Sequence, residues 1–406
     1  MKANKYTESS NCFCPALIIS APSSGSGKTT ITAAMATYHR QQGIKVRIFK
    51  TGPDFIDPMI LEQASGHAVY QLDLWMVGKA QCQALIFEAA TTADLILIEG
   101  VMGLFDGTPS TADLSEFFNI PVLAVIDGSA MAQTFGALAL GLQQYRPELK
   151  IAGVIANKIA GEKHGQMILN SMPSSITNVD YILAEPKISL AERHLGLIQA
   201  SELHDIQEKL AIAAGLISKS ILTELPAPIK FLKPEDNSPT LQSYEFAGGA
   251  VKQQPLINKR IIVAKDLSFN FLYQANLQLL EQAGAKLLFS SPLNDQQLPE
   301  GDALYLPGGY PELYVKQLSE NLTYIKSVQQ FAKSNKPILA ECGGMLYLLD
   351  SLTTTENRRF SMSQVIPGDG VMKNKLSAIG QQYANLSNFC ILSDHEKNRE
   401  TVNNNE

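Results

Sequence analysis

The chain has 406 residues, more than one ordinary hydrophobic core accommodates, so we expect two domains. With 45% hydrophobic and 18% charged residues, its composition is typical of a soluble globular protein. The formal net charge of -6 provides no basic footprint for nucleic acid or for an anionic membrane surface. No apolar stretch reaches the roughly 18 residues that a membrane-spanning helix requires. These observations predict a cytoplasmic protein that binds neither nucleic acid nor membrane.

The cysteines form neither a disulfide framework nor a paired zinc-binding pattern; they stand at positions 12, 14, 82, 342 and 390. This usage favours a reducing compartment. The apolar segment from Cys12 to Ala21 follows two lysines, so a secretory signal peptide is one interpretation of it. We favour a strand, because the segment leads directly into a glycine-rich loop. Cys12 and Cys14 are expected in a loose N-terminal tail without a metal.

The first half of the chain alternates short β-branched runs with helical patterns, which predicts βαβ units and a parallel sheet. A helix is expected over residues 29–42, because this stretch starts at a glycine-rich turn and ends before Gly43, a suitable C-cap. The predicted strands are Ala16–Ser20, Lys45–Phe49, Leu95–Glu99, Val122–Asp127 and Ile151–Asn157.

A change in composition and periodicity marks the predicted domain boundary. Residues 226–258 are rich in proline and lack periodicity, which indicates a linker. The α/β pattern then restarts, with strands expected at Arg260–Asp266, Lys286–Ser290 and Ala303–Leu306 and a helix at Asn270–Gly284. We therefore predict a first domain at 15–225, a linker at 226–258, a second domain at 259–390 and a disordered polar tail at 391–406.

The strongest local pattern is a phosphate-binding loop, APSSGSGKTT, at residues 21–30 between a strand and a helix. Gly25 and Gly27 let backbone N–H groups point at phosphate oxygens, Lys28 supplies a positive charge, and the Thr29 hydroxyl is a magnesium ligand. The helix N-terminus favours the same anion. The alternative is a glycine-rich turn without a nucleotide, since Pro22 replaces the usual first glycine. The predicted nucleotide-binding residues in the loop are Gly25, Ser26, Gly27, Lys28, Thr29 and Thr30.

Acidic residues follow neighbouring strands at the edge where a phosphate loop must lie. Glu99 ends the run DLILIE, and Asp106 lies in the glycine-rich loop after it. A second strand ends at Lys50, which we assign to the nucleotide site, and Asp54 follows in GPDFIDP. Glu99, Asp54 and Thr29 are the candidate magnesium ligands. The alternative is that Asp54, Asp57 and Asp106 are ordinary turn residues.

In the second domain, a strand stops at Cys342 and is followed by two glycines, the layout of a nucleophile elbow. Gly308 and Gly309, in a turn after the preceding strand, together with Gly343, are candidates for binding an oxyanion. The alternative is a small core cysteine. Of the histidines that could serve as the base, only His395 follows Cys342, and it is either catalytic or a solvated tail residue.

Taken together, five motifs resemble the cobyrinate a,c-diamide synthase family. They are SAPSSGSGKTT, FKTGPDFIDP with LDLWM after it, LIEGVMGLFDG, LYLPGGYPELY and ILAECGGMLYLL, and they occur in that family's order over residues 15–380. The resemblance implies an α/β protein with a P-loop, dethiobiotin-synthetase-like domain of parallel strands, followed by a class I glutamine amidotransferase-like domain. In that family the proline at position 22 is usual.

The resemblance also implies the chemistry. Cys342 attacks the side-chain amide of glutamine and releases ammonia, with Gly308, Gly309 and Gly343 in the oxyanion region. ATP, bound with Mg²⁺, phosphorylates a carboxylate of cobyrinate, and ammonia displaces the phosphate. Asp54, Glu99 and Asp106 match positions that handle the substrate and the intermediate. The expected partners are a tetrapyrrole, glutamine and ATP, and we also consider a homodimer.

The resemblance fades after Gly380, where family members continue to a segment containing the catalytic histidine. We therefore expect a truncated glutaminase, with His395 as a displaced remnant or no base at all, and weak glutamine-driven amidation. Alternative substrates are hydrogenobyrinate and nickel-sirohydrochlorin, and cobyric acid synthases are close relatives. A non-enzymatic alternative is a partitioning-type ATPase switch, although its loop carries a lysine where this chain has Ser23.

Overall fold

The computed structural model describes residues 11–188, 192–193, 196–197, 202, 205–234 and 254–373. The chain divides into two compact units, Met1–Pro255 with Leu272–Ala283, and Leu256–Phe271 with Gly284–Glu406. Within the described ranges, no helix is long and apolar enough to cross a membrane.

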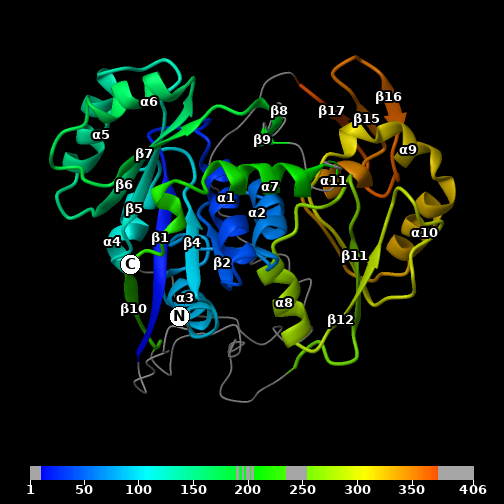
Figure 1. The fold of residues 1–406 in the computed structure, drawn as a ribbon. Coiled ribbons are helices and arrows are strands. Elements are labelled where there is room, and N and C mark those ends of the chain that lie inside the picture. Colours follow the sequence, from blue (N-terminus) through cyan, green and yellow to red (C-terminus); the bar gives the residue numbers. More distant parts are fainter. Residues whose placement is uncertain are drawn as a thin grey trace, which may run out of the picture. The chain divides into compact units, whose positions relative to one another are not determined.

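The first unit is built on a largely parallel sheet with the strand order β3-β2-β4-β1-β5-β6-β7 (Figure 1). Its central strands are buried on both faces, which explains why their sequences are continuous apolar runs. The strands are β1 (Asn11–Ser20), β2 (Val46–Lys50), β3 (Tyr70–Gln71), β4 (Leu95–Glu99), β5 (Val122–Asp127), β6 (Ile151–Ile159) and β7 (Val179–Leu183). A short antiparallel pair, β8 (Glu192–Arg193) and β9 (Gly196–Leu197), lies outside this sheet.

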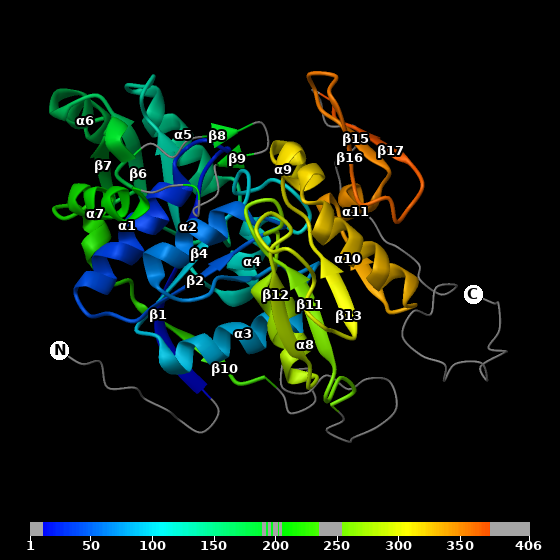
Figure 2. The same ribbon diagram turned by 90° about the vertical axis from the view of Figure 1, so that its right-hand side faces the viewer.

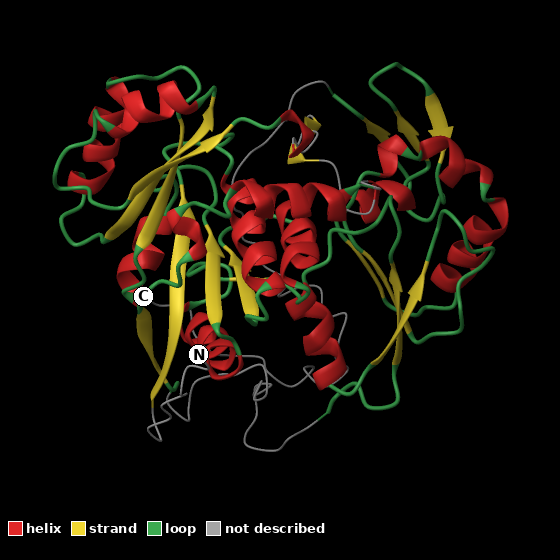
Figure 3. Cartoon of the chain, viewed as in Figure 1, coloured by secondary structure: helices red, strands yellow, loops and turns green. Residues whose placement is uncertain are grey.

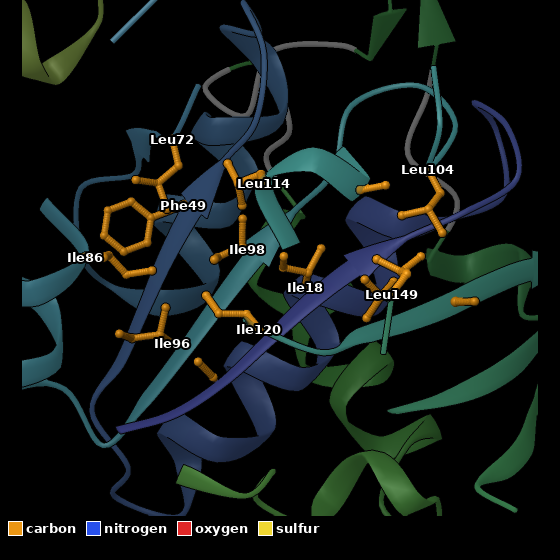
Figure 4. Packing of buried hydrophobic residues seen from close by; sticks show 14 of the residues in the cluster. Ile18, Phe49, Leu72, Ile86, Ile96, Ile98, Leu104, Leu114, Ile120 and Leu149 are labelled. Carbon is orange, nitrogen blue, oxygen red and sulfur yellow. The ribbon is translucent and has the colours of Figure 1, made fainter. Parts of the chain in front are cut away.

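Helices cover both faces of this sheet (Figure 3). One face packs against α3 (Lys79–Thr92), α4 (Thr111–Phe118) and α5 (Thr134–Gln144), and Figure 4 shows part of that cluster, with Ile18 and Ile98 in its centre. The other face packs against α1 (Lys28–Gln41), α2 (Ile56–Ser65) and α7 (Ile206–Leu216). Among the described residues, the unit also contains α6 (Glu162–Leu169), α8 (Gln274–Gln282) and the 3₁₀ turns η1 (Pro186–Ile188) and η3 (Ile221–Thr223).

Two expectations about the ends of the first domain are wrong. The residues Cys12 and Cys14 do not lie in a loose tail; both are buried in β1. The predicted linker at 226–258 begins with a strand, β10 (Pro228–Leu232), which pairs antiparallel with the start of β1. This pairing buries Phe231 against the same helix face as the two cysteines. The rest of that linker between residues 235 and 253 lies outside the described residues.

The second unit contains a parallel four-stranded sheet in the order β12-β11-β13-β14 (Figure 2). The strands are β11 (Arg260–Ala264), β12 (Lys286–Ser290), β13 (Ala303–Leu306) and β14 (Ile338–Ala340), and the helices are α9 (Val315–Glu320), α10 (Leu322–Lys333), α11 (Gly343–Leu348) and the 3₁₀ turn η4 (Pro311–Leu313). Helix α10 turns Tyr324, Val328 and Phe331 toward the core. A small sheet of β15 (Ser351–Thr353), β16 (Arg359–Ser361) and β17 (Asp369–Val371) completes the unit.

Candidate functional site

The phosphate loop leads from β1 into α1, as expected. Gly25 and Gly27 have positive φ angles of 79° and 93°, which glycine adopts without strain. Gly27 has a second constraint, because a Cβ atom there would lie 2.1 Å from the side-chain nitrogen of Asn157. Glycine at position 27 is therefore required both by the turn and by the neighbouring strand end.

Lys28 and Thr29 are the first residues of α1, and their side chains bind different groups. Lys28 is buried, and its Nζ donates to the carbonyl oxygens of Met102 at 2.7 Å and Ser23 at 3.1 Å. Burial lowers the pKa of Lys28, although nearby carboxylates including Glu99 oppose the effect. The Thr29 hydroxyl donates to Glu99 Oε1 at 2.7 Å. Thr30, by contrast, lines a small hollow of about 10 Å³ with side chains of α2 and α7.

Four charged residues at the ends of two neighbouring strands, β2 and β4, form one group, here called the Lys50 cluster: Lys50, Asp54, Asp57 and Glu99. The Lys50 ammonium lies 2.8 Å from Asp57 Oδ2, 3.0 Å from Glu99 Oε1 and 3.6 Å from Asp54 Oδ2. Both Lys50 and Glu99 are almost completely buried. The sequence predicted Lys50, Asp54 and Glu99 as site residues, and the fold brings all three together.

The pKa values of the four groups in the Lys50 cluster are shifted in different directions. Burial raises the pKa of Glu99 to about 7, against the attraction of the Lys50 ammonium. Burial, with repulsion from Asp57, raises the pKa of Asp54 to about 6. Burial alone would raise the pKa of Asp57 as well, but Lys50 overrides it and lowers that pKa. Burial likewise opposes the charge on Lys50, and the three carboxylates together raise its pKa.

The residues at this edge fit a magnesium ion that binds with nucleotide phosphates. Glu99 Oε2 is buried and has no hydrogen-bond partner among the described residues, while Oε1 holds the Thr29 hydroxyl. Within the described part of the chain, no three His, Cys, Asp or Glu side chains form a metal-binding group. Mg²⁺ commonly takes one or two carboxylates and completes its shell with water and phosphate oxygens, so a site of Glu99 and Thr29 is sufficient.

The remaining predicted acids hold backbone turns. Asp54 Oδ1 accepts hydrogen bonds from the N–H groups of Ile56 and Asp57 in the first turn of α2, while its other oxygen faces Lys50. Asp106 is exposed and accepts from the N–H of Gly103 at 2.9 Å, which closes the loop after β4. Asp54 therefore joins the Lys50 cluster, and Asp106 does not.

Motif reasoning missed the residues that support the loop from the end of β6. Asn157 donates to the Ser26 carbonyl at 3.0 Å, and Lys158 donates to the Gly25 carbonyl at 2.7 Å and pairs with Asp127. Outward-facing carbonyls in this loop need donors, because its N–H groups face the phosphate site. The position of Asn157 at the carboxyl end of a predicted strand was the available signal.

In the second unit, Cys342 sits between β14 and α11 with φ 48° and ψ −109°, an unfavourable conformation for a residue with a Cβ. Its thiol is exposed. The following glycine positions are crowded: a Cβ at Gly344 would lie 2.1 Å from the Leu306 carbonyl, and one at Gly343 would lie 3.1 Å from the Gly309 nitrogen. This is the geometry of a nucleophile elbow.

The oxyanion candidates surround this cysteine. A Cβ at Gly308 would lie 3.3 Å from the Cβ of Cys342, and one at Gly309 would meet the Ser268 carbonyl at 2.1 Å. The N–H of Gly343 belongs to the first turn of α11, where it has no intrahelical acceptor. The predicted base, His395, lies outside the described residues.

Two family models match the chain. Residues 17–193 match the CobQ/CobB/MinD/ParA nucleotide binding domain, and residues 260–403 match the CobB/CobQ-like glutamine amidotransferase domain. The second match continues past Gly380, where we expected the resemblance to fade, and it includes His395.

Curated relatives match across both domains. Hydrogenobyrinate a,c-diamide synthase of Stutzerimonas stutzeri is 52% identical over 92% of this chain and 84% of the relative. The enzyme of the same name from Pseudomonas aeruginosa is 49% identical over 92% and 83% of the two chains. Cobyrinate a,c-diamide synthase of Herminiimonas arsenicoxydans is 46% identical over 90% and 81%. The matches to a,c-diamide synthases, together with the amidotransferase model, favour a synthase over a partitioning-type ATPase.

Proposed function

Since the chain belongs to the family of hydrogenobyrinate and cobyrinate a,c-diamide synthases, ATP-dependent ligases with a glutamine amidotransferase domain, we propose that it amidates the a and c carboxylates of cobyrinate or hydrogenobyrinate through an acyl phosphate. The observation that carries the proposal is the convergence of Lys28, Thr29 and the Lys50 cluster at one sheet edge. It combines a phosphate cradle with carboxylates suited to the magnesium ion that accompanies nucleotide phosphates.

A free carboxylate resists ammonia, because its negative charge repels a nucleophile and oxide is a poor leaving group. Transfer of the γ-phosphoryl group of ATP to a carboxylate oxygen removes both obstacles and releases ADP. Ammonia then attacks the carbonyl carbon, the bond to the phosphate oxygen breaks, and the products are an amide and phosphate. Lys28 and the N–H groups of the loop would stabilise the transferring phosphoryl group.

Lys50 would orient Glu99, because its buried ammonium pairs with three carboxylates. A bound Mg²⁺, held by Glu99 and Thr29, would neutralise charge on the β- and γ-phosphates. With its pKa raised toward neutrality, Glu99 needs the positive partners around it to stay ionised as a ligand. Asp54 would contribute through Lys50 and through the position of α2.

Ammonia would come from glutamine at Cys342. The thiolate attacks the side-chain amide carbon, the amide nitrogen leaves as ammonia, and water hydrolyses the resulting thioester to glutamate. The N–H groups of Gly309 and Gly343 would stabilise the oxyanion, with Gly308 holding the turn against the elbow. His395 remains our candidate for the base. We further propose that the reaction takes place in the cytoplasm, with a homodimer as the assembly.

The experiment supplies cobyrinate and hydrogenobyrinate in separate reactions, each with ATP and magnesium and with either glutamine or ammonium. Mass spectrometry of the tetrapyrrole should show two successive carboxylate-to-amide conversions. A substrate labelled with heavy oxygen in its carboxylates should pass one labelled oxygen to phosphate per amide formed. Nickel-sirohydrochlorin, run in parallel, tests the alternative substrate. Absence of amidation with every tetrapyrrole would reject the function, and unlabelled phosphate would reject the acyl phosphate.

Replacement of Glu99 tests the metal assignment. Glu99→Gln keeps an acceptor for the Thr29 hydroxyl but removes the charge, so we expect ammonium-driven amidation to fall about 100-fold and the magnesium requirement to rise. Glu116→Gln, on the surface of α4, is the matched control and should retain activity. Equal magnesium dependence in both variants would contradict the assignment.

A further inference from the structure

The motif Leu72-Asp73-Leu74-Trp75-Met76 follows β3 at the carboxyl edge of the first sheet, and the chemistry above leaves it without a role. Strand β3 pairs with β2 so that Gln71 lies opposite Lys50, and the N–H of Leu72 donates to the Lys50 carbonyl at 2.9 Å. The motif therefore leaves the sheet directly beside the strand end that carries the Lys50 cluster.

This motif folds into a rigid turn that displays an indole. The carboxylate of Asp73, a buried side chain, accepts hydrogen bonds from the N–H groups of Trp75 at 2.9 Å and Met76 at 2.8 Å. Leu72 is fully buried and anchors the turn to the core (Figure 4). Trp75 is nevertheless 36% exposed. An aromatic side chain held on a fixed turn loses little conformational entropy when a ligand stacks on it.

A second large apolar side chain is exposed on the other side of the Lys50 cluster. Met102, in the loop after β4, is 45% exposed and has a positive φ of 49°. Its carbonyl accepts the hydrogen bond of Lys28, so the strained backbone is tied to the phosphate loop. Because β2 lies between β3 and β4, Trp75 and Met102 flank the strand end that carries Lys50.

We propose that Trp75, assisted by Met102, forms the platform that holds the face of the tetrapyrrole ring while one of its peripheral carboxylates reaches the phosphate loop. This inference rests on the proposed function and adds the residues that bind the ring. The turn is three strand spacings from β1, on the order of 14 Å, so an extended ligand is needed to reach from one to the other. A broad conjugated ring with carboxylates on its rim meets that requirement, and indole stacks on such a surface.

The chain offers a direct test, because Trp75 is its only tryptophan. Titration of the full-length protein with cobyrinate, and separately with hydrogenobyrinate, should quench the tryptophan fluorescence to saturation, since a coloured ring stacked on the indole accepts its excitation. N-acetyltryptophanamide at the same concentration corrects for light absorbed by the ring. Glutamine alone should leave the emission unchanged.

Variants then separate ring binding from nucleotide binding. We expect Trp75→Ala to raise the KM for the tetrapyrrole about tenfold, and Trp75→Phe to raise it less, with the KM for ATP unchanged in both. Phe13→Ala is the matched control: this exposed aromatic lies near the amino-terminal end of β1, opposite Lys230 of β10 and away from the carboxyl edge, and its loss should change neither KM.

The outcomes distinguish failure of the Trp75 platform from failure of the proposed function. Amidation without saturable quenching, or with an unchanged tetrapyrrole KM in Trp75→Ala, would overturn the platform and leave the proposed function standing. An equal rise in both KM values would also overturn it, because the turn would then serve only the fold. Failure of the wild-type protein to amidate any tetrapyrrole would instead reject the proposed function.

Discussion

At the scale of single residues, Lys50 shows how a buried charge ties the site to stability. Its side chain is 2% exposed and contacts three carboxylates. A buried ion pair contributes modestly to stability, but removal of one partner leaves uncompensated buried charge. We expect Lys50→Met, which keeps the length and removes the charge, to lower the free energy of unfolding by about 3 kcal/mol, measured by urea denaturation.

The matched control for this change is Lys158→Met. Lys158 pairs with Asp127, but its side chain is 44% exposed, and solvent screens such a pair. Its loss should cost less than about 1 kcal/mol of stability. Nucleotide affinity should still fall in this variant, because Lys158 also holds the Gly25 carbonyl. Equal destabilisation in the two variants would contradict the importance of burial in the Lys50 cluster.

At the scale of elements, the elbow between β14 and α11 depends on close backbone packing. A methyl group at Gly344 would lie 2.1 Å from the Leu306 carbonyl, a backbone atom that has no flexible way to yield. We expect Gly344→Ala to displace Cys342 and to reduce glutamine-driven amidation at least about tenfold. Ammonium-driven amidation should remain, as measured by mass analysis of the product.

Gly141→Ala provides the control for an added methyl group. Gly141 lies within α5, and a Cβ there meets no atom within 4 Å. Alanine is the better helix former by about 1 kcal/mol, so this variant should unfold at a slightly higher denaturant concentration with both activities intact. Loss of glutamine-driven activity in Gly141→Ala would show that the effect at Gly344 is not specific to the elbow.

Helix α1 also carries a pH-dependent contact. His39 is buried near the end of α1, and its Nε2 lies 3.2 Å from the Leu222 carbonyl. Burial lowers the pKa of His39, although the Leu222 carbonyl opposes this. The unfolded chain therefore binds this proton more readily, so stability is highest above the unfolded pKa of about 6.5 and falls as the pH drops below it. His39→Gln should flatten the dependence of the denaturation midpoint on pH between about 5 and 7; an unchanged slope would assign it to other groups.

The sequence predicts best those strands that are determined by their own residues, and it predicts poorly a strand that depends on a distant partner. The strands Leu95–Glu99, Val122–Asp127, Lys286–Ser290 and Ala303–Leu306 have the predicted bounds. For Leu95–Glu99 and Val122–Asp127 the reason is that a strand buried between helix layers is a continuous apolar run in the sequence. Strand β10 was missed, because it is half exposed, contains a proline and gains its partner more than 200 residues away in β1. Short-range patterns do not report such a pairing.

In the candidate site, too, the sequence predicts the features that depend on local residue patterns and misses contacts between distant segments. The phosphate loop and the cysteine elbow were visible, because each depends on a short run of glycines with fixed spacing. The contacts of Asn157 and Lys158 were not, because they depend on the order of the strands in the sheet. Asp106 accepts a hydrogen bond from Gly103 within its loop, and its assignment to catalysis, made by resemblance, stays a prediction.

At the scale of the whole molecule, each unit has a core of its own. The first sheet lies between two clusters of buried side chains, and the second unit buries a separate cluster around β11 and β13. Each reaction centre also lies within one unit: the phosphate loop and the Lys50 cluster in the first, Cys342 and its glycines in the second. The two half-reactions should therefore respond independently to substitutions in their own centres.

Replacement of the nucleophile tests this independence most directly. Cys342→Ala removes the thiol without adding bulk to the elbow. The close packing of Gly343 and Gly344 against neighbouring backbone atoms should therefore stay unchanged. We expect glutamine-driven amidation to fall by about 1000-fold or more, since the thiol that forms the thioester is removed, while ammonium-driven amidation and the KM for ATP stay at wild-type values. The ratio of the two rates in the wild-type protein, measured with the same tetrapyrrole, shows how efficiently its own glutaminase works, and a low ratio would support our expectation of a weak one. Loss of both activities in a folded Cys342→Ala protein would contradict the independence of the two centres.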